Sequence, residues 1–113
     1  MKFPFVLENS VIPKLLSIFI SIEAITLWPF IISRKKLNST MFNHEMIHIK
    51  QQQELLVVGF YLLYVFYWLR GFWLYRDSEI AYLAIPFEQE AYSHEFNQDY
   101  LENRKIFSWW KYR

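Results

Sequence analysis

The stretch NHEMIHIKQQQE, residues 43–54, lies between two strongly apolar segments and decides how the chain is interpreted. It places His44 and His48 four positions apart, with Glu45 directly after the first histidine. On a helix of 3.6 residues per turn, two such positions share one face and lie about 6 Å apart along the axis. Two imidazoles so placed can converge on one Zn²⁺. Glu45 then points beside the metal, where it can hold a metal-bound water and take its proton. The alternative is an ordinary solvated helix face.

Two histidines do not complete a catalytic zinc site, which usually has three protein ligands and one open position. In metzincins the helix turns at a glycine and a third histidine follows, but here Gln51 and Glu54 stand at the corresponding positions. Without that glycine the helix should continue, and Glu54 is not expected to reach the metal. A glutamate from a later helix is the other source of a ligand, and four acids are clustered there: Glu79, Glu88, Glu90 and Glu95. Carboxylates near a helix N-terminus are also favoured by the helix dipole alone.

The motif HEMIH followed by the glutamines at 51 and 52, with FEQEAY at residues 87–92, resembles the gluzincin metallopeptidases. It is also similar to small bacterial proteins of the Bacteroidetes type that carry HExxHxxQQ and FExEAY. In gluzincins the third zinc ligand is a glutamate on a downstream helix, in an ExEAD or ExxAD motif. The resemblance therefore implies Glu88 as the third ligand, with Glu90 as the alternative. It places Tyr92 where an aspartate usually contacts a zinc-bound histidine, so Tyr92 and Gln52 are the candidates for supporting the ligands.

The chain is expected to form a single domain over residues 1–113, with a mostly helical α+β fold. A first helix is expected over residues 11–22. Residues 24–33 are rich in Ile, Thr, Trp and Phe, which favours a strand. Pro29 cannot donate to a strand ladder, so this strand is expected at a sheet edge. The resemblance adds a minimal zincin-like fold, in which such an edge strand pairs with an extended peptide substrate. A buried hydrophobic segment without a ligand is the alternative.

The helix that carries the histidines is expected to begin after a cap at residues 38–40 and to run on through the uncharged residues 55–69. A short helix over 78–84 must stop before Pro86, because the residue preceding a proline avoids the α region. Pro86 itself suits the first position of another helix, over residues 86–105. The aromatic and basic tail, residues 106–113, fits either a membrane interface or a flap over the core.

The composition is unusually apolar, with 54% hydrophobic and 21% aromatic residues. Some of that surface is expected to meet a membrane or a partner. The formal net charge of +1 argues against a nucleic-acid partner. The chain has no cysteine, which excludes disulfides, cysteine-ligated zinc and a cysteine nucleophile.

The expected metal site restricts the membrane topology. Residues 55–69 are too short for a span, and one span between His48 and Glu88 would place these residues on opposite sides of the bilayer. Residues 11–33 remain a candidate span, and the basic residues 34–36 would then place the site in the cytoplasm. We expect a protein that lies on or partly in the membrane. A soluble cytoplasmic protein with an aromatic core is the alternative.

The resemblance implies a zinc-dependent metallopeptidase that acts on a peptide or protein substrate. Zn²⁺ would be held by His44, His48 and Glu88, and Glu45 would activate a metal-bound water. His94 and Tyr100 are further candidates for contacts at the site, although His94 also fits an ordinary surface position. Two other classes stay open: a zinc-binding structural or membrane-interaction protein without hydrolytic activity, and a small membrane-associated helical protein without a metal.

Overall fold

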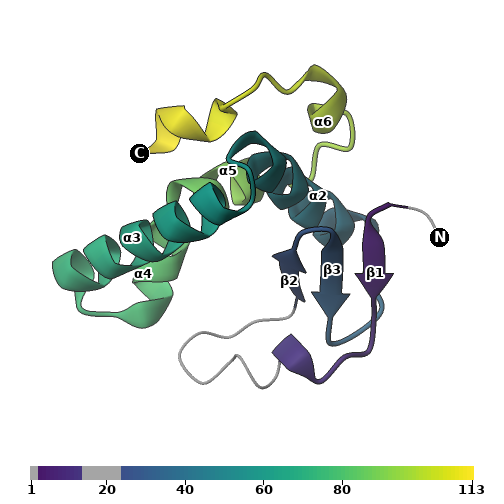
Figure 1. The fold of residues 1–113 in the computed structure, drawn as a ribbon, viewed down its shortest axis with the longest axis horizontal. Helices are drawn as coiled ribbons and strands as arrows, with labels where there is room; N and C mark the ends of the chain where they lie inside the picture. Colours follow the sequence, from purple (N-terminus) through teal and green to yellow (C-terminus); the bar gives the residue numbers. More distant parts are fainter. Residues whose placement is uncertain (1–2, 14–23) are drawn as a thin grey trace.

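A computed structural model of the chain describes residues 3–13 and 24–113 and combines a small sheet with several helices (Figure 1). The sheet contains β1 (Phe5–Leu7), β2 (Ala24–Leu27) and β3 (Phe30–Ser33) in the order β1-β3-β2. Strand β1 pairs parallel with β3, and β2 pairs antiparallel with β3. The prediction of a mostly helical α+β fold with a small sheet is confirmed, although β1 was not predicted.

The single strand predicted for residues 24–33 is wrong in form, because the segment is a hairpin of β2 and β3. Pro29 lies in the turn between them, where its fixed φ and its missing N–H are tolerated. Strand β2 is at the edge of the sheet, and β3 is its central strand. Residues 24–33 therefore cannot belong to a helical membrane span over 11–33. The helix predicted for 11–22 lies largely outside the described residues.

Helix α2 (Ser39–Glu54) carries the histidines and begins as predicted, since the Asn38 side chain accepts a hydrogen bond from the Met41 amide at 2.8 Å. The predicted continuation through residue 69 is wrong. The chain turns at Leu56 and Val57, both with positive φ, and α3 (Val58–Tyr75) leaves at 113° to α2. No Gly or Pro marks this break. Folding back lets the apolar side chains of α3 pack on the rest of the molecule, which a continued helix would prevent.

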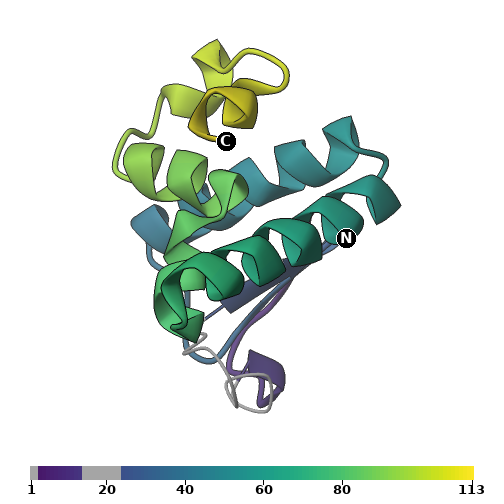
Figure 2. The same ribbon diagram turned by 90° about the vertical axis from the view of Figure 1, so that its left-hand side faces the viewer.

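Helices α4 (Ser78–Ala84) and α5 (Pro86–His94) follow, and both begin where the sequence predicts. The predicted extension of α5 to residue 105 is wrong. The chain leaves the helix after His94, forms the short α6 (Tyr100–Asn103) and ends in the 3-10 helix η1 (Ser108–Tyr112). The sheet and this C-terminal segment lie at opposite ends of the molecule, with α2, α3 and α5 between them (Figures 1 and 2).

The C-terminal tail packs on the core as a flap. Trp109 is buried in one cluster with Phe60, Ile85 and Phe87, and its ring centroid lies 4.8 Å from that of Phe87. The neighbouring Trp110 stays exposed. Of the two alternatives for the tail, a membrane interface or a flap over the core, the burial of Trp109 supports the flap.

Among the described residues, no helix on its own combines the length and the apolar character that crossing a membrane requires. Helices α2 and α3 meet these conditions only when they are taken together across their bend.

Candidate metal centre

His44, Glu45 and His48 are brought together on α2, as their spacing predicts. All three are buried, and each offers one potential ligand atom within 4.8 Å of the others. The two imidazole centroids are 4.9 Å apart. This group could hold a metal ion.

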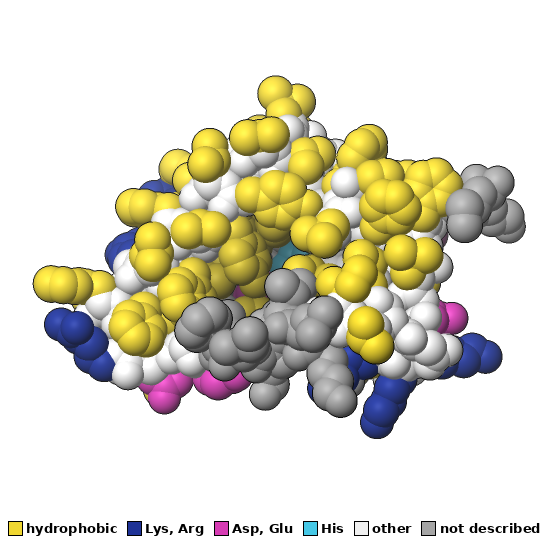
Figure 3. Space-filling model, turned by 60° about the horizontal axis from the view of Figure 1, so that its bottom comes forward, with side chains coloured by type: hydrophobic (Ala, Val, Ile, Leu, Met, Phe, Trp, Pro, Cys, Tyr) yellow, Lys and Arg dark blue, Asp and Glu magenta, His cyan; other side chains and the backbone are white. Residues whose placement is uncertain are grey.

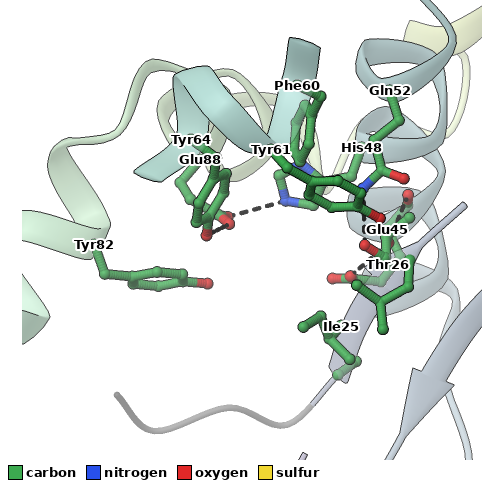
Figure 4. A pocket seen from close by; sticks show the side chains of 12 residues that line it. Ile25, Thr26, Glu45, His48, Gln52, Phe60, Tyr61, Tyr64, Tyr82 and Glu88 are labelled. Atoms are coloured by element: carbon green, nitrogen blue, oxygen red, sulfur yellow. Dashed lines mark hydrogen bonds and ion pairs between the residues drawn. The ribbon is translucent and has the colours of Figure 1, made fainter. Parts of the chain in front are cut away.

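Glu88 reaches the same place from α5. Its side chain is buried, and its Oε1 lies 3.1 Å from His44 Nε2. The same oxygen lies 3.0 Å from His48 Nε2 (Figure 4). Pro86 starts α5 just before Glu88 and so fixes where this carboxylate leaves the helix. In a tetrahedral zinc site with bonds of about 2.0–2.1 Å, neighbouring ligand atoms lie about 3.3 Å apart. The distances from Glu88 Oε1 to the two Nε2 atoms, 3.1 and 3.0 Å, are therefore close to those between ligand atoms on one zinc ion.

Both imidazoles are oriented through their other nitrogen. His44 Nδ1 lies 2.9 Å from Glu95 Oε1, and His48 Nδ1 lies 2.7 Å from Gln51 Oε1. A carboxylate and an amide oxygen only accept hydrogen bonds, so each Nδ1 must carry a proton and donate it. The neutral form of each ring then presents the lone pair of Nε2 toward Glu88. This is how histidines that bind metals are usually held.

The metal-free centre is an ion pair. Burial disfavours a charge on His48, but the charge of Glu88 and the hydrogen bond to it outweigh burial and raise the pKa of His48 to about 9. Burial also disfavours a charge on His44, but its hydrogen bond to Glu88 and the charges of Glu45 and Glu88 together raise its pKa above the ordinary value. For Glu88, burial opposes ionisation, yet the two imidazoles hold its pKa well below the ordinary value. Ionisable groups whose pKa values are shifted this far from the ordinary values are typical of functional sites.

Glu45 is held beside the ligands by the sheet. Its Oε1 accepts a hydrogen bond from the Thr26 hydroxyl at 2.8 Å, and its Oε2 lies 3.8 Å from His44 Nε2. Gln52 also binds β2, because it accepts from the Trp28 amide at 2.7 Å and donates to the Thr26 carbonyl at 2.8 Å. Gln52 thus anchors the hairpin, and Gln51 is the glutamine that contacts an imidazole.

Tyr92 lies against His44, with ring centroids 4.5 Å apart, and its hydroxyl pairs with that of Tyr82 at 3.0 Å. The carboxylate that contacts His44 is instead that of Glu95, three residues after Tyr92. Sequence reasoning missed this contact, although a signal existed: positions 88 and 95 are seven apart and therefore share a helical face.

Glu90 is placed away from the imidazoles, in a buried cluster with Arg104. The Arg104 guanidinium donates to Glu90 Oε2 at 2.5 Å and to Glu54 Oε2 at 2.5 Å. Glu90 also accepts from the Tyr100 hydroxyl at 2.6 Å and from Gln51 Nε2 at 3.0 Å. His94 stacks on Tyr100 with 3.8 Å between centroids. Glu90, Tyr100 and His94 therefore support the C-terminal flap.

Tyr64 was missed entirely, because a continuous helix would carry it away from the histidines. Its hydroxyl donates to Glu88 Oε2 at 2.6 Å. The fold-back of α3 also closes one side of a cavity of about 200 Å³ beside the ligands (Figure 4). The cavity is lined from β2, α2 and α3, with His48, Glu45 and Glu88 in its wall and Tyr61, Tyr64 and Tyr82 around it.

Comparison of the chain with protein-family models, with curated proteins and with solved structures finds no match.

Proposed function

We propose that the chain is a zinc-dependent metallopeptidase with a minimal zincin-like fold. The observation that supports it most directly is the position of Glu88 Oε1, 3.1 Å and 3.0 Å from the Nε2 atoms of His44 and His48. These three residues, from α2 and α5, would hold the zinc ion, and Glu45 lies next to them with its carboxylate already oriented by Thr26.

Zinc, when bound, would polarise the scissile carbonyl and lower the pKa of a water molecule in the cavity. Glu45 accepts the proton of the attacking water and returns it to the leaving amine. The pKa of Tyr82 is held above its ordinary value by burial and by the charge of Glu88, so its hydroxyl keeps its proton and can donate a hydrogen bond inside the cavity. Strand β2 is at a sheet edge and all four of its residues line the cavity, which suits backbone pairing with an extended peptide.

The test is the variant Glu45→Gln, which keeps the size of the side chain but removes the base. We expect zinc to bind within about threefold of wild type, while peptide hydrolysis falls by about 10²–10⁴-fold, the usual contribution of a general base. The exposed Glu102→Gln on α6 is the matched control and should keep full activity. Equal cleavage rates for Glu45→Gln and wild type, measured on a peptide library, would contradict the proposal.

The second candidate is a zinc-binding protein without hydrolytic activity. The burial of the centre favours it, since His44, Glu45, His48 and Glu88 are each at most 7% exposed. An ion there would cross-link α2 and α5. This candidate requires stoichiometric zinc by elemental analysis, together with no difference between wild type and Glu45→Gln on any peptide.

A further inference from the structure

Among the described residues, no element covers one face of helix α3. Val58, Leu62, Val65, Leu69 and Trp73 follow one another at helical spacing, and each is more than half exposed. We call these five residues the α3 stripe. Arg70 is the only charged residue within the helix. A stripe of this length that no described element covers indicates a surface that docks on something apolar.

Helix α3 also contributes to the cavity beside the metal ligands. Tyr61 and Tyr64 line the cavity, and the stripe runs along another face of the same helix, since Leu62 and Val65 each follow one of these tyrosines by one position, a turn of about 100°. On the face drawn in Figure 3, a histidine is visible in a hollow with many hydrophobic side chains around it, and most charged side chains lie toward the edges of the face. Leu27 of β2 lines the opposite wall, and the hairpin exposes Trp28 and Phe30. Apolar surface therefore lies on both sides of the site.

The positively charged side chains near the α3 stripe indicate what kind of partner binds to it. Arg70 and Arg113 line one pocket of about 260 Å³ between α3 and the C-terminal tail, and no acidic residue lines it. Among residues 3–13 and 24–113, no carboxylate pairs with Arg70. Two guanidiniums in one pocket are suited to a phosphate group. Arg113 also stacks 3.5 Å from the Trp110 ring, and Arg76 lies 4.8 Å from the Trp73 ring. Tryptophan and arginine beside an apolar surface are the residues enriched where proteins meet lipid headgroups.

We propose that the α3 stripe docks on a lipid bilayer with anionic headgroups, and that Arg70 and Arg113 bind headgroup phosphates. The hydrophobic face around the hollow in Figure 3 would then present the mouth of the cavity to the bilayer. This second step rests on the proposed peptidase function: the substrate is then an apolar peptide segment that leaves or lies in the bilayer surface, where it meets β2 and the metal ligands together.

The test is flotation of the full chain with two kinds of vesicle, phosphatidylcholine alone and phosphatidylcholine mixed with phosphatidylglycerol. Binding should be stronger to the mixed vesicles. The double variant Leu62→Glu, Leu69→Glu should lose at least about tenfold in binding to both, because charge is costly in the apolar layer. Phe96→Glu places one such charge at an exposed hydrophobic side chain outside α3 and should change little. Replacing Arg70 or Arg113 by Gln should cost about fivefold each, and only on the mixed vesicles.

Unchanged vesicle binding by the double variant, with circular dichroism showing it folded, would overturn the docking surface. So would a wild-type chain that stays unbound to both vesicles, or one that forms a stable dimer through α3 in their absence. The vesicle experiment is repeated with Glu45→Gln, so that it does not depend on hydrolysis. A chain that binds vesicles but cleaves no peptide overturns the proposed function alone. A chain that cleaves polar peptides equally well with and without vesicles overturns the inferred substrate alone.

Discussion

Gln51 is a buried side chain whose surroundings leave it one orientation. Its amide nitrogen donates to the Phe87 carbonyl and to Glu90 Oε1, each at 3.0 Å, so its oxygen is the atom left for His48. Burial opposes ionisation of Glu90, but hydrogen bonds led by that of Arg104 lower its pKa, so it remains a pure acceptor. Glu90 therefore fixes the tautomer of His48 through Gln51, although Glu90 does not itself contact the imidazole.

The variant Glu90→Gln should weaken zinc binding by about tenfold, the lower range for residues that support a metal ligand. A glutamine at 90 can present either its oxygen or its NH₂ to Gln51, so the orientation of Gln51 is no longer enforced. Stability should also fall by about 1–3 kcal/mol, because Arg104 loses one of its two buried carboxylates. Zinc affinity is measured by competition with a chromophoric chelator, at a temperature where the variant is folded. Glu102→Gln is the control, and an unchanged affinity in Glu90→Gln would refute this role.

At the scale of elements, the contact between α3 and α4 depends on a missing side chain. A Cβ on Gly71 would lie 3.0 Å from the Ala81 Cα and 3.2 Å from its Cβ, and the Ala81 backbone cannot yield as a flexible side chain would. Gly71→Ala should therefore push α4 away and cost about 1–3 kcal/mol of unfolding free energy. Gly59→Ala on the same helix is the matched control. Its nearest contact is an ordinary 3.5 Å, and it should gain up to about 1 kcal/mol from helix propensity. Urea unfolding of both variants measures this, and equal effects would contradict it.

Several elements could be predicted because their signals are local. The Asn38 cap, the shared face of the two histidines, and the boundary at Pro86 each depend on residues within one or two turns. The break between α2 and α3 could not be predicted, because neither Leu56 nor Val57 is a helix-ending residue such as Gly or Pro. Val57 has φ 64° and ψ −62° in a tight turn closed by the Val58 amide on the Leu56 carbonyl, a strained conformation for a β-branched residue. Long-range packing imposes this break, so Tyr64 was missed with it.

At the scale of the whole molecule, the metal centre gathers elements that are far apart in the chain. His44 and Glu88 are separated by 44 positions, and Glu45 is tied to β2 by Thr26. Such a site does not exist in the unfolded chain, so the free energy of metal binding would add to the stability of the fold. Without a metal ion the same residues form a buried cluster of charges, and the protonation of this cluster then affects stability.

The stability of the metal-free protein should fall as pH rises from about 6.5 to 9. Burial opposes a charge on His48, but Glu88 raises its pKa from 6.5 to about 9, so its contribution is complete below about 6.5 and lost as pH passes 9. The loss amounts to at most about 3 kcal/mol. Urea unfolding across this range measures it. His48→Gln should flatten the profile, whereas His94→Gln, at a histidine whose pKa is lowered mainly by burial, should preserve it.

Zinc affinity should show the opposite trend, since the ion must displace the proton on His48 before Nε2 can bind. Between pH 6.5 and 9 the dissociation constant should fall about tenfold per pH unit for each proton displaced, and level off above the pKa of His48. The raised pKa of His44 allows a second displaced proton and a steeper slope at the acidic end. Calorimetric titrations in two buffers of different ionisation enthalpy count these protons directly. An affinity independent of pH, with no proton released, would show that zinc does not bind at His44 and His48. The proposed peptidase activity and the alternative role of zinc as a cross-link between α2 and α5 would then both lose their basis.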